Sequence, residues 1–331
     1  MTDKVTIHAH YDADGVTSAL FTAYHLKHKC DIVFPDKFGD VSNCNDGDYM
    51  VDMRPTENIS GINVIDHHPG HFEEPNYNLI WKPYPAGKIC WEEFKDDIPR
   101  KEWWKLVVST SGDVAIYETP YEVWKEFPIL FQKNKSSTWK RFGGGNTNKT
   151  FWSGYPFYQW RLSSPINALC RIGKPDVAYT LLKICQSPVQ LVSHPDGIDA
   201  KEKVNKETDK AIKGSDMTQY DFHSGYGLML IVYNSKYRIS GRISAMLLSE
   251  PQYSNYTIMA INKKDGKGSM RGDLCNFFKG ILEENLDYIK TAGHGVAMGV
   301  ECDLKKINRL KYDIHAIMNE FVVTNQLWKT I

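Results

Sequence analysis

The sequence lacks an excess of charge of either sign. Across its 331 residues, 40 lysines and arginines balance 40 aspartates and glutamates. Proteins that grip long duplex DNA do so through clustered lysine and arginine, so a basic footprint over the whole protein is excluded. A short nucleic acid, or a phosphate whose charge is masked by a metal, remains compatible with this composition.

Long hydrophobic runs and paired cysteines are also missing. No stretch approaches the roughly 20 apolar residues that span a bilayer, and the N-terminus lacks the layout of a signal peptide. The seven cysteines are irregularly spaced and no two lie within four residues, which argues against a zinc knuckle. We therefore expect free, mostly buried thiols in a soluble cytoplasmic protein that does not contact membrane.

Short apolar runs alternate with helical patterns near the N-terminus. Ile7 lies in one of the expected strands and Leu20 in the expected helix between the first two strands. This alternation predicts the α/β class, with a doubly wound parallel sheet that binds ligands beyond the carboxyl ends of its strands. The strands are expected at 4–9, 31–34, 49–52, 62–66 and near 107–109, and the helix at 15–28.

The composition changes twice further along the chain. Residues 120–160 combine tryptophans and tyrosines with basic residues, and we interpret them as an insertion. The insertion either packs as a local aromatic cluster or offers a stacking surface to a single strand. A charged helical pattern at 199–213 predicts a connecting helix. We therefore predict a catalytic domain at 1–190, a linker at 191–225 and a smaller α/β domain at 226–331, which ends in a helix at 303–321.

Two carboxylates and a histidine mark the end of the first predicted strand. Asp12 and Asp14 lie two residues apart, so both can point to one side of a pocket, and His8 stands four residues before Asp12. Gly15 lets the backbone turn tightly into the helix that follows.

Further acidic residues follow the later apolar segments. They are Asp52, Asp66, which precedes His67 and His68, and Asp113. An aspartate at a strand end is usually a cap or a solvated residue. Several at one sheet edge would repel one another, however, and divalent cations would remove that conflict. Aspartate with histidine suits Mn²⁺, with Mg²⁺ or Co²⁺ as alternatives, and two such ions about 3.5–4 Å apart activate water for attack on phosphorus.

In this order, the four segments resemble the motifs of the DHH phosphoesterase superfamily. The segments read HAHYDADG, VDMRP, DHHP and GDVA. The superfamily includes the RecJ exonucleases, the nanoRNases, the cyclic di-AMP phosphodiesterases and the family II inorganic pyrophosphatases. The resemblance covers roughly residues 1–115 and 160–320, and the segment at 163–173 is similar to the inter-domain helix of archaeal RecJ-like proteins. It implies a two-metal site in a cleft between two domains.

The resemblance also implies a role for each residue. His68 would face the scissile phosphate as an electrophile or proton donor, and Asp66 would orient a ligating histidine. Two alternatives stay open: His10 could assist or replace His8, and Asp96 or Asp97 could take the place of Asp113. The implied ligands of one metal are His8, Asp12 and Asp52, and those of the other are Asp14, Asp52, His67 and Asp113.

The last third resembles the DHH-associated C-terminal domain. Residues 291–299 match its glycine–histidine signature, with Ala292 in place of the usual first glycine, and residues 269–271 match its SxR element. In relatives these elements bind the phosphate or the chain next to the cleaved bond. Glycines let the backbone approach a phosphate, and an arginine can grip it with two hydrogen bonds. The implied substrate-binding residues are Ser269, Arg271, Gly293, His294 and Gly295.

These observations predict a phosphoesterase that uses two Mn²⁺ ions. We expect hydrolysis of short single-stranded RNA or DNA from an end, releasing nucleoside monophosphates. A cyclic or linear dinucleotide is the next candidate. Polyphosphate and pyrophosphate rank third, because the C-terminal signature differs from that of family II pyrophosphatases. A DHH module that binds nucleic acid without turnover is the alternative from another class. A homodimer, and a replication or repair partner, stay open.

Overall fold

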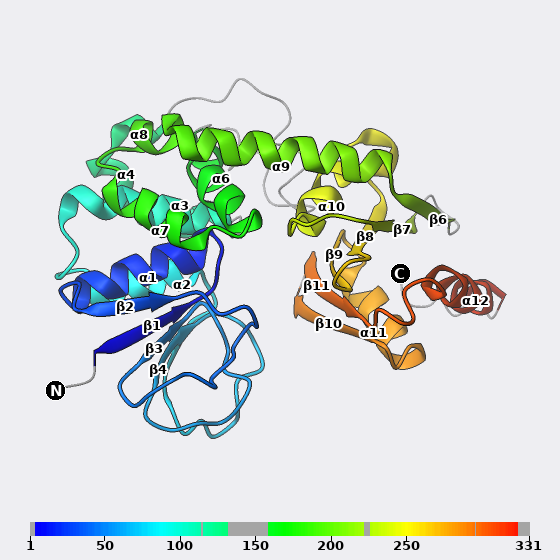
Figure 1. Ribbon diagram of the computed structural model, residues 1–331, viewed down its shortest axis with the longest axis horizontal. Coiled ribbons are helices and arrows are strands. Elements are labelled where there is room, and N and C mark those ends of the chain that lie inside the picture. The colour runs from blue at the N-terminus through cyan, green and yellow to red at the C-terminus, as the bar shows by residue number, and fades with distance from the viewer. Residues whose placement is uncertain (1–3, 114, 132–157, 222–225, 295, 324–331) are drawn as a thin grey trace. The chain divides into compact units, whose positions relative to one another are not determined.

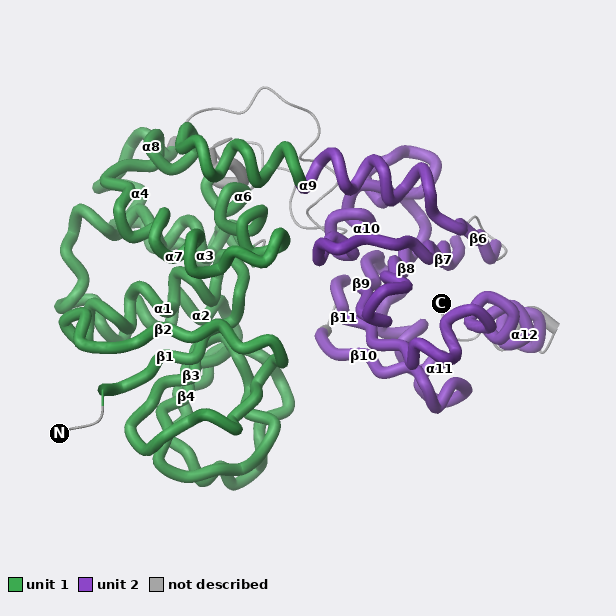
Figure 2. The backbone as a smooth tube through the Cα atoms, in the orientation of Figure 1, with its two compact units in different colours: residues 1–135, 153–203 green, residues 136–152, 204–331 purple. Residues whose placement is uncertain are grey.

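The computed structural model describes residues 4–113, 115–131, 158–221, 226–294 and 296–323 (Figure 1). The core of the predicted insertion, at 132–157, lies outside the described residues, so its interpretation stays a prediction. The chain forms two compact units (Figure 2), and the boundary between them falls at Lys203–Val204, inside helix α9. No helix of the described ranges is long and apolar enough to cross a membrane.

Unit 1 is built on a parallel sheet of five strands in the order β2-β1-β3-β4-β5. This confirms the predicted α/β class. The chain leaves β1 toward β2 on one side and returns to β3 on the other. Open α/β sheets bind ligands at such a switch point, beyond the carboxyl ends of the strands. The strands are β1 (Val5–Ala9), β2 (Cys30–Val33), β3 (Tyr49–Val51), β4 (Asn63–Asp66) and β5 (Asn78–Trp81).

Helices gather on one face of this sheet (Figure 1), and α1 contacts α2, α3 and α7. Helix α1 begins after Asp12, whose side chain accepts the backbone N–H groups of Asp14 and Gly15. Met50 of β3 packs with Val41 and Tyr77, which lie in loops, in a small hydrophobic cluster. The helices of unit 1 are α1 (Ala13–His25), α2 (Ala86–Phe94), α3 (Leu106–Gly112), α4 (Tyr121–Glu126), α6 (Tyr158–Arg171), α7 (Pro175–Ile184), α8 (Pro188–Ser193) and the start of α9 (Pro195–Lys213).

The structure corrects three sequence-based expectations. The strand expected near 107–109 is wrong, because these residues lie in the buried helix α3, and a short apolar run does not separate a buried helix from a strand. Strand β5 was not expected. Helix α12 starts at Leu310 instead of 303, because the side chain of Asp303 accepts the backbone N–H of Lys305 and holds a turn there.

Unit 2 contains a six-stranded sheet in the order β10-β11-β9-β8-β7-β6. Strands β7 and β8 are parallel, and every other neighbouring pair is antiparallel. Phe278 of α11 and Ile314 of α12 belong to the hydrophobic core formed with this sheet. The elements are β6 (Asp216–Asp221), β7 (Gly227–Tyr233), α10 (Ser240–Leu248), β8 (Tyr256–Asn262), β9 (Lys267–Arg271), α11 (Cys275–Asn285), β10 (Ile289–His294), β11 (Ala297–Cys302) and α12 (Leu310–Val323).

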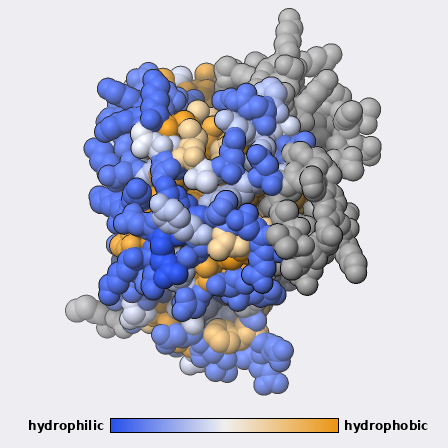
Figure 3. All heavy atoms as spheres, turned by 90° about the vertical axis from the view of Figure 1, so that its right-hand side faces the viewer, coloured by the Kyte–Doolittle hydropathy of each residue, from blue (hydrophilic) through white to orange (hydrophobic). Residues whose placement is uncertain are grey.

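Hydrophilic residues cover most of the described surface in Figure 3, and hydrophobic residues form small scattered patches there. The seven cysteines all lie in the described ranges, none of them forms a disulfide, and five are buried. This confirms the expectation of free, mostly buried thiols.

Candidate metal centre and catalytic site

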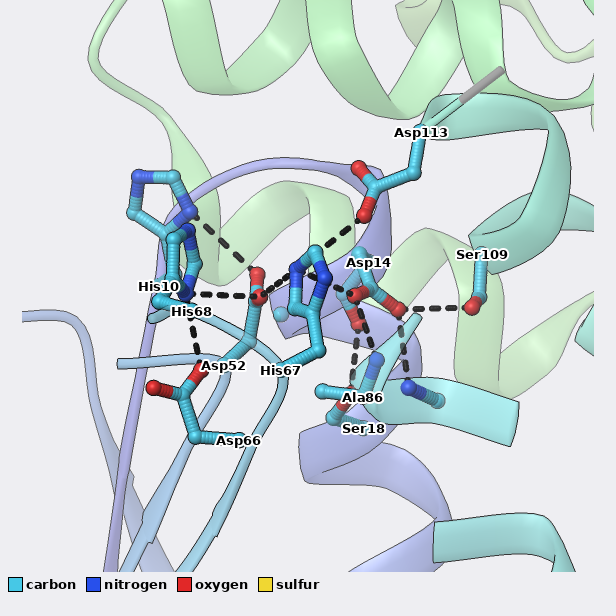
Figure 4. A network of polar contacts seen from close by, with 12 residues as sticks. His10, Asp14, Ser18, Asp52, Asp66, His67, His68, Ala86, Ser109 and Asp113 are labelled. Carbon is cyan, nitrogen blue, oxygen red and sulfur yellow. Dashed lines mark hydrogen bonds and ion pairs between the residues drawn. The ribbon is translucent and has the colours of Figure 1, made fainter. Parts of the chain in front are cut away.

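Acidic and histidine side chains converge beyond the carboxyl ends of β1, β3 and β4 (Figure 4). The first turn of α1 and the end of α3 supply the rest. The described residues contain three sets of side chains whose candidate ligand atoms lie within 4.8 Å of one another. These sets are His10 with Asp12 and Asp52, Asp14 with His67 and Asp113, and Asp52 with His67 and His68.

Asp14 is fully buried, and its carboxylate accepts three hydrogen bonds. The backbone N–H groups of Ala86 and Gly87, at the start of α2, each donate to one of its oxygens at 2.8 Å. The hydroxyl of Ser109, on α3, donates at 2.6 Å. A Cβ at Gly87 would come within 2.6 Å of the Ser109 Oγ, so this close approach requires glycine. Donors from two segments, the start of α2 and helix α3, thus fix the orientation of a single carboxylate.

Asp52 lies at the centre of the cluster. Figure 4 shows it between His10 and His68 on one side and His67 on the other. Its Oδ1 is 3.2 Å from His67 Nε2, and its Oδ2 is 3.3 Å from His10 Nδ1. The backbone of Asp52 has a φ of 57°, in the left-handed region that aspartate and asparagine tolerate better than most residues. A strained backbone at this position is typical of a functional site.

The structure brings His10, and not His8, beside Asp12 and Asp52. His10 Nδ1 lies 3.1 Å from Asp12 Oδ2. His8 is buried within β1, with its Nε2 3.5 Å from Asp48 Oδ2, and it belongs to none of the three sets. Because β1 ends at Ala9, His10 is the first residue beyond the sheet edge where the other side chains gather.

Asp113 joins the cluster from the C-terminal end of α3. Its Oδ2 lies 3.2 Å from His67 Nε2. The sequence alternatives lie elsewhere: Asp97 is exposed and pairs with His25 at 2.8 Å, and Asp96 is exposed beside it. Asp113 is therefore the better candidate ligand.

A chain of hydrogen bonds runs from the candidate catalytic histidine into the domain. His68 Nδ1 donates to Asp66 Oδ1 at 2.7 Å, and His71 Nε2 donates to Asp66 Oδ2 at 3.0 Å. The other nitrogen of a neutral His71 ring accepts the hydroxyl of Tyr77 at 2.9 Å. These bonds hold the His68 ring through its Nδ1. His71 and Tyr77 were not expected, because no motif marks them.

The charges of the cluster are unbalanced. Burial and the charge of Asp52 raise the pKa of Asp14 to about 7. Burial with the charges of Asp14 and Asp52 also raises the pKa of Asp113 well above its usual range. Burial opposes protonation of His67, but the hydrogen bond and charge of Asp52, with Asp113 and Asp14, raise its pKa to about 10.

Not every carboxylate shifts upward. Burial disfavours the charge of Asp12, but the charge and hydrogen bond of His10 outweigh it and lower the pKa of Asp12. The pKa of Asp66 is lowered in the same way, against burial, by hydrogen bonds from His68 and His71. The cluster without cations thus holds protons on some groups to offset the negative charge of others. Divalent cations could take the place of those protons, so the donor set fits such ions.

The described residues among those implied in unit 2 belong to one small region of its sheet. Arg271 on β9 pairs in register with Ala297 on β11, and Ala297 pairs with His294 on β10. At the start of α10, a Cβ on Gly241 would lie 3.4 Å from Arg271 Nη2 and 3.6 Å from Ser269 Oγ. Gly293 adopts a φ of 123°, which a residue with a side chain rarely adopts. Gly295 and the side chain of His294 lie outside the described residues.

No protein-family model and no curated protein matches the sequence. Solved structures do match the fold. RecJ from Thermus thermophilus in complex with Mn²⁺ aligns with a TM-score of 0.65 and 16% identity, over 96% of this chain and 52% of RecJ. The chain therefore has the fold of RecJ and spans about half the length of the Thermus protein.

Two further structures agree. The exonuclease RecJ bound to manganese gives a TM-score of 0.60 at 15% identity, over 96% of this chain and 90% of that one. The DHH domain of a protein described as a member of a ribosomal protein family gives 0.61 at 15% identity, over 96% and 86%. These neighbours show that the chain shares the fold of RecJ and of that DHH domain.

Proposed function

We propose that this protein is a metal-dependent phosphodiesterase that hydrolyses short single-stranded nucleic acid from an end. The products would be nucleoside monophosphates. The observation that carries the proposal is the central position of Asp52, which shares its two carboxylate oxygens between His10 and His67. A carboxylate so placed suits a bridge between two cations.

The candidate ligands divide into two sets around that bridge. The identity of the ions follows from the ligand types, since carboxylates with imidazoles suit Mn²⁺, with Mg²⁺ or Co²⁺ as alternatives. Cations bound here would lower the pKa of a water molecule and neutralise charge on the phosphate. The first set is His10, Asp12 and Asp52, and the second is Asp14, Asp52, His67 and Asp113.

The protein's own groups would orient the reaction. His68, whose Nδ1 donates to Asp66, would in its doubly protonated form donate the Nε2 proton to the departing oxygen and become neutral. The three hydrogen bonds on Asp14 keep a ligand in one orientation without rearrangement. In unit 2, Arg271 and Ser269 would hold a neighbouring phosphate of the substrate, which positions the reacting bond.

The fold neighbours named as RecJ support a nuclease reaction. RecJ structures with this fold were determined with Mn²⁺ and with Mg²⁺, and one of these proteins is described as an exonuclease. A cyclic or linear dinucleotide is the nearest alternative substrate, since it presents the same phosphodiester between two nucleosides.

A substrate panel tests the proposal. Protein supplied with Mn²⁺ is incubated with end-labelled RNA and DNA oligomers, linear and cyclic dinucleotides, polyphosphate, and bis-(p-nitrophenyl) phosphate. We expect mononucleotides from the earliest time points on a short oligomer, and no release after chelation. Binding of the oligomer with no turnover of any substrate would instead identify a non-catalytic nucleic-acid-binding module.

A further inference from the structure

One aromatic ring contacts two histidines of the candidate catalytic site. The ring of Phe38, in the loop between β2 and β3, lies 5.3 Å from the ring of His10 and 5.0 Å from that of His68. Both contacts are close to perpendicular, at 84° and 77°. Phe38 nevertheless remains 38% exposed, so the two histidines do not cover the whole ring.

The position of Phe38 is built into the loop. The next residue, Gly39, has a φ of 70°, and a Cβ there would lie 2.0 Å from the carbonyl oxygen of Arg54. The carbonyl of Gly39 accepts both the backbone N–H and the hydroxyl of Thr56. The side chain of Arg54 in turn donates to the carbonyls of Pro69 and Gly70, directly after His68. The loop that carries the ring is thus tied to the segment that carries the histidine.

A phenyl ring in this place cannot ligate a cation or donate to a phosphate. It can offer an apolar face to another flat ring, and nucleobases stack on such faces. We propose that Phe38 is a specificity-determining residue that stacks against the base of the nucleotide attached to the scissile phosphate. This inference rests on the proposed function and narrows it, because an inorganic polyphosphate has nothing for the ring to contact.

The alternative is a purely supporting role, in which Phe38 only keeps His10 and His68 in place. Stacking tolerates every base, since each base has a flat face. We therefore expect modest preference among the four bases, but a clear requirement for a base. A substrate that lacks only the base separates the two roles.

The test compares a short oligonucleotide with the same oligonucleotide whose terminal residue is abasic. Phe38→Leu keeps apolar volume but removes the ring, and Phe38→Trp restores a larger one. We expect Phe38→Leu to lower kcat/KM on the intact oligonucleotide by about tenfold or more, which is about 1.4 kcal/mol. On the abasic substrate the change in kcat/KM should stay within about twofold. Phe38→Trp should restore kcat/KM on the intact oligonucleotide. Phe72→Leu, the same change at a phenylalanine that is 40% exposed, is the matched control.

Equal losses on both substrates, or no loss on either, would overturn the inference while leaving the phosphodiesterase proposal intact. A binding measurement keeps it testable even if the wild type hydrolyses neither substrate. Calorimetric titration with a nucleoside monophosphate and with ribose 5-phosphate, both with Mn²⁺, should show tighter binding of the nucleotide to the wild type. That difference should disappear in Phe38→Leu. A difference that survives in the variant would contradict a stacking role for Phe38.

Discussion

Two regions of the molecule handle charge in opposite ways. At the sheet edge of unit 1, carboxylates lie close together, and burial together with the charges of neighbouring aspartates raises the pKa values of Asp14 and Asp113. On the sheet of unit 2, Arg271, Ser269 and Gly241 bring a cation, a hydroxyl and a helix start together. The first region fits cations, and the second fits an anion. The proposed function accordingly assigns the chemistry to unit 1 and recognition of the longer substrate to unit 2.

The largest expected effect comes from Asp52. Asp52→Asn keeps the left-handed backbone accessible, because asparagine tolerates that region, and it removes the shared negative charge. We expect hydrolysis to be abolished on every substrate, large or small, with loss of bound metal in elemental analysis. A folded Asp52→Asn protein that keeps activity within about tenfold of wild type would refute the two-cation site, and Asp52→Ala should behave in the same way.

His68 tests chemistry apart from metal binding. We expect His68→Ala to lower kcat by about 10²-fold or more, the scale of a lost acid, while the bound metal remains. Elemental analysis beside single-turnover kinetics measures both quantities. Loss of metal in this variant would identify His68 as a metal ligand. Its Nδ1 lies 4.0 Å from Asp52 Oδ1, close enough for both residues to bind one ion.

A variant of Arg271 tests whether unit 2 recognises the substrate while unit 1 carries out the chemistry. Arg271→Ala should cost about 2–3 kcal/mol in kcat/KM on an oligonucleotide, the range for a hydrogen bond to a charged group. A small p-nitrophenyl phosphodiester, which offers no second phosphate, should be hydrolysed almost as before. If both substrates lose equally and the melting temperature falls, Arg271 supports the fold of unit 2 and does not select the substrate.

The pH dependence of metal binding is a finer test of the charge imbalance in unit 1. Asp14, with a pKa near 7, and His67, with a pKa near 10, must lose their protons to become ligands. The apparent affinity for Mn²⁺ should therefore rise with pH, by about tenfold per unit for each proton released, and more steeply below pH 7 than above it. Calorimetry in buffers of different ionisation enthalpy counts those protons.

Ser109 supplies the matched variant for that titration. Its hydroxyl hydrogen bond lowers the pKa of Asp14 against burial. Ser109→Ala should thus raise the pKa of Asp14 and move the change in slope to higher pH. An affinity for Mn²⁺ that does not depend on pH, in the wild type or in Ser109→Ala, would contradict the expected release of protons on metal binding.

The sequence predicted the gathering of Asp14, Asp52, His67 and Asp113, because acidic motifs that follow apolar segments tend to meet at one sheet edge. It favoured His8 over His10, whereas the structure places His10 beside Asp12 and Asp52. That choice depends on where β1 ends, and sequence patterns locate element ends only to within a few residues.

Contacts between residues far apart in the sequence could not be predicted either. Ser109 lies 95 residues from Asp14, in a segment expected to be a strand, and the contact exists because α3 packs against α1. Phe38 belongs to a loop with no recognised motif. The sequence placed Arg271 and His294 in separate motifs, and the antiparallel register of β9, β11 and β10 then puts them in one row.

The central claim is that hydrolysis requires cations at the shared Asp52 site. The most direct measurement titrates Mn²⁺ into metal-stripped protein while recording mononucleotide release from a short single-stranded oligomer. We predict no release without metal, and activity that saturates as bound Mn²⁺ approaches two ions per chain. Release by the metal-free protein, or two bound ions with no release from any phosphodiester, would contradict the account.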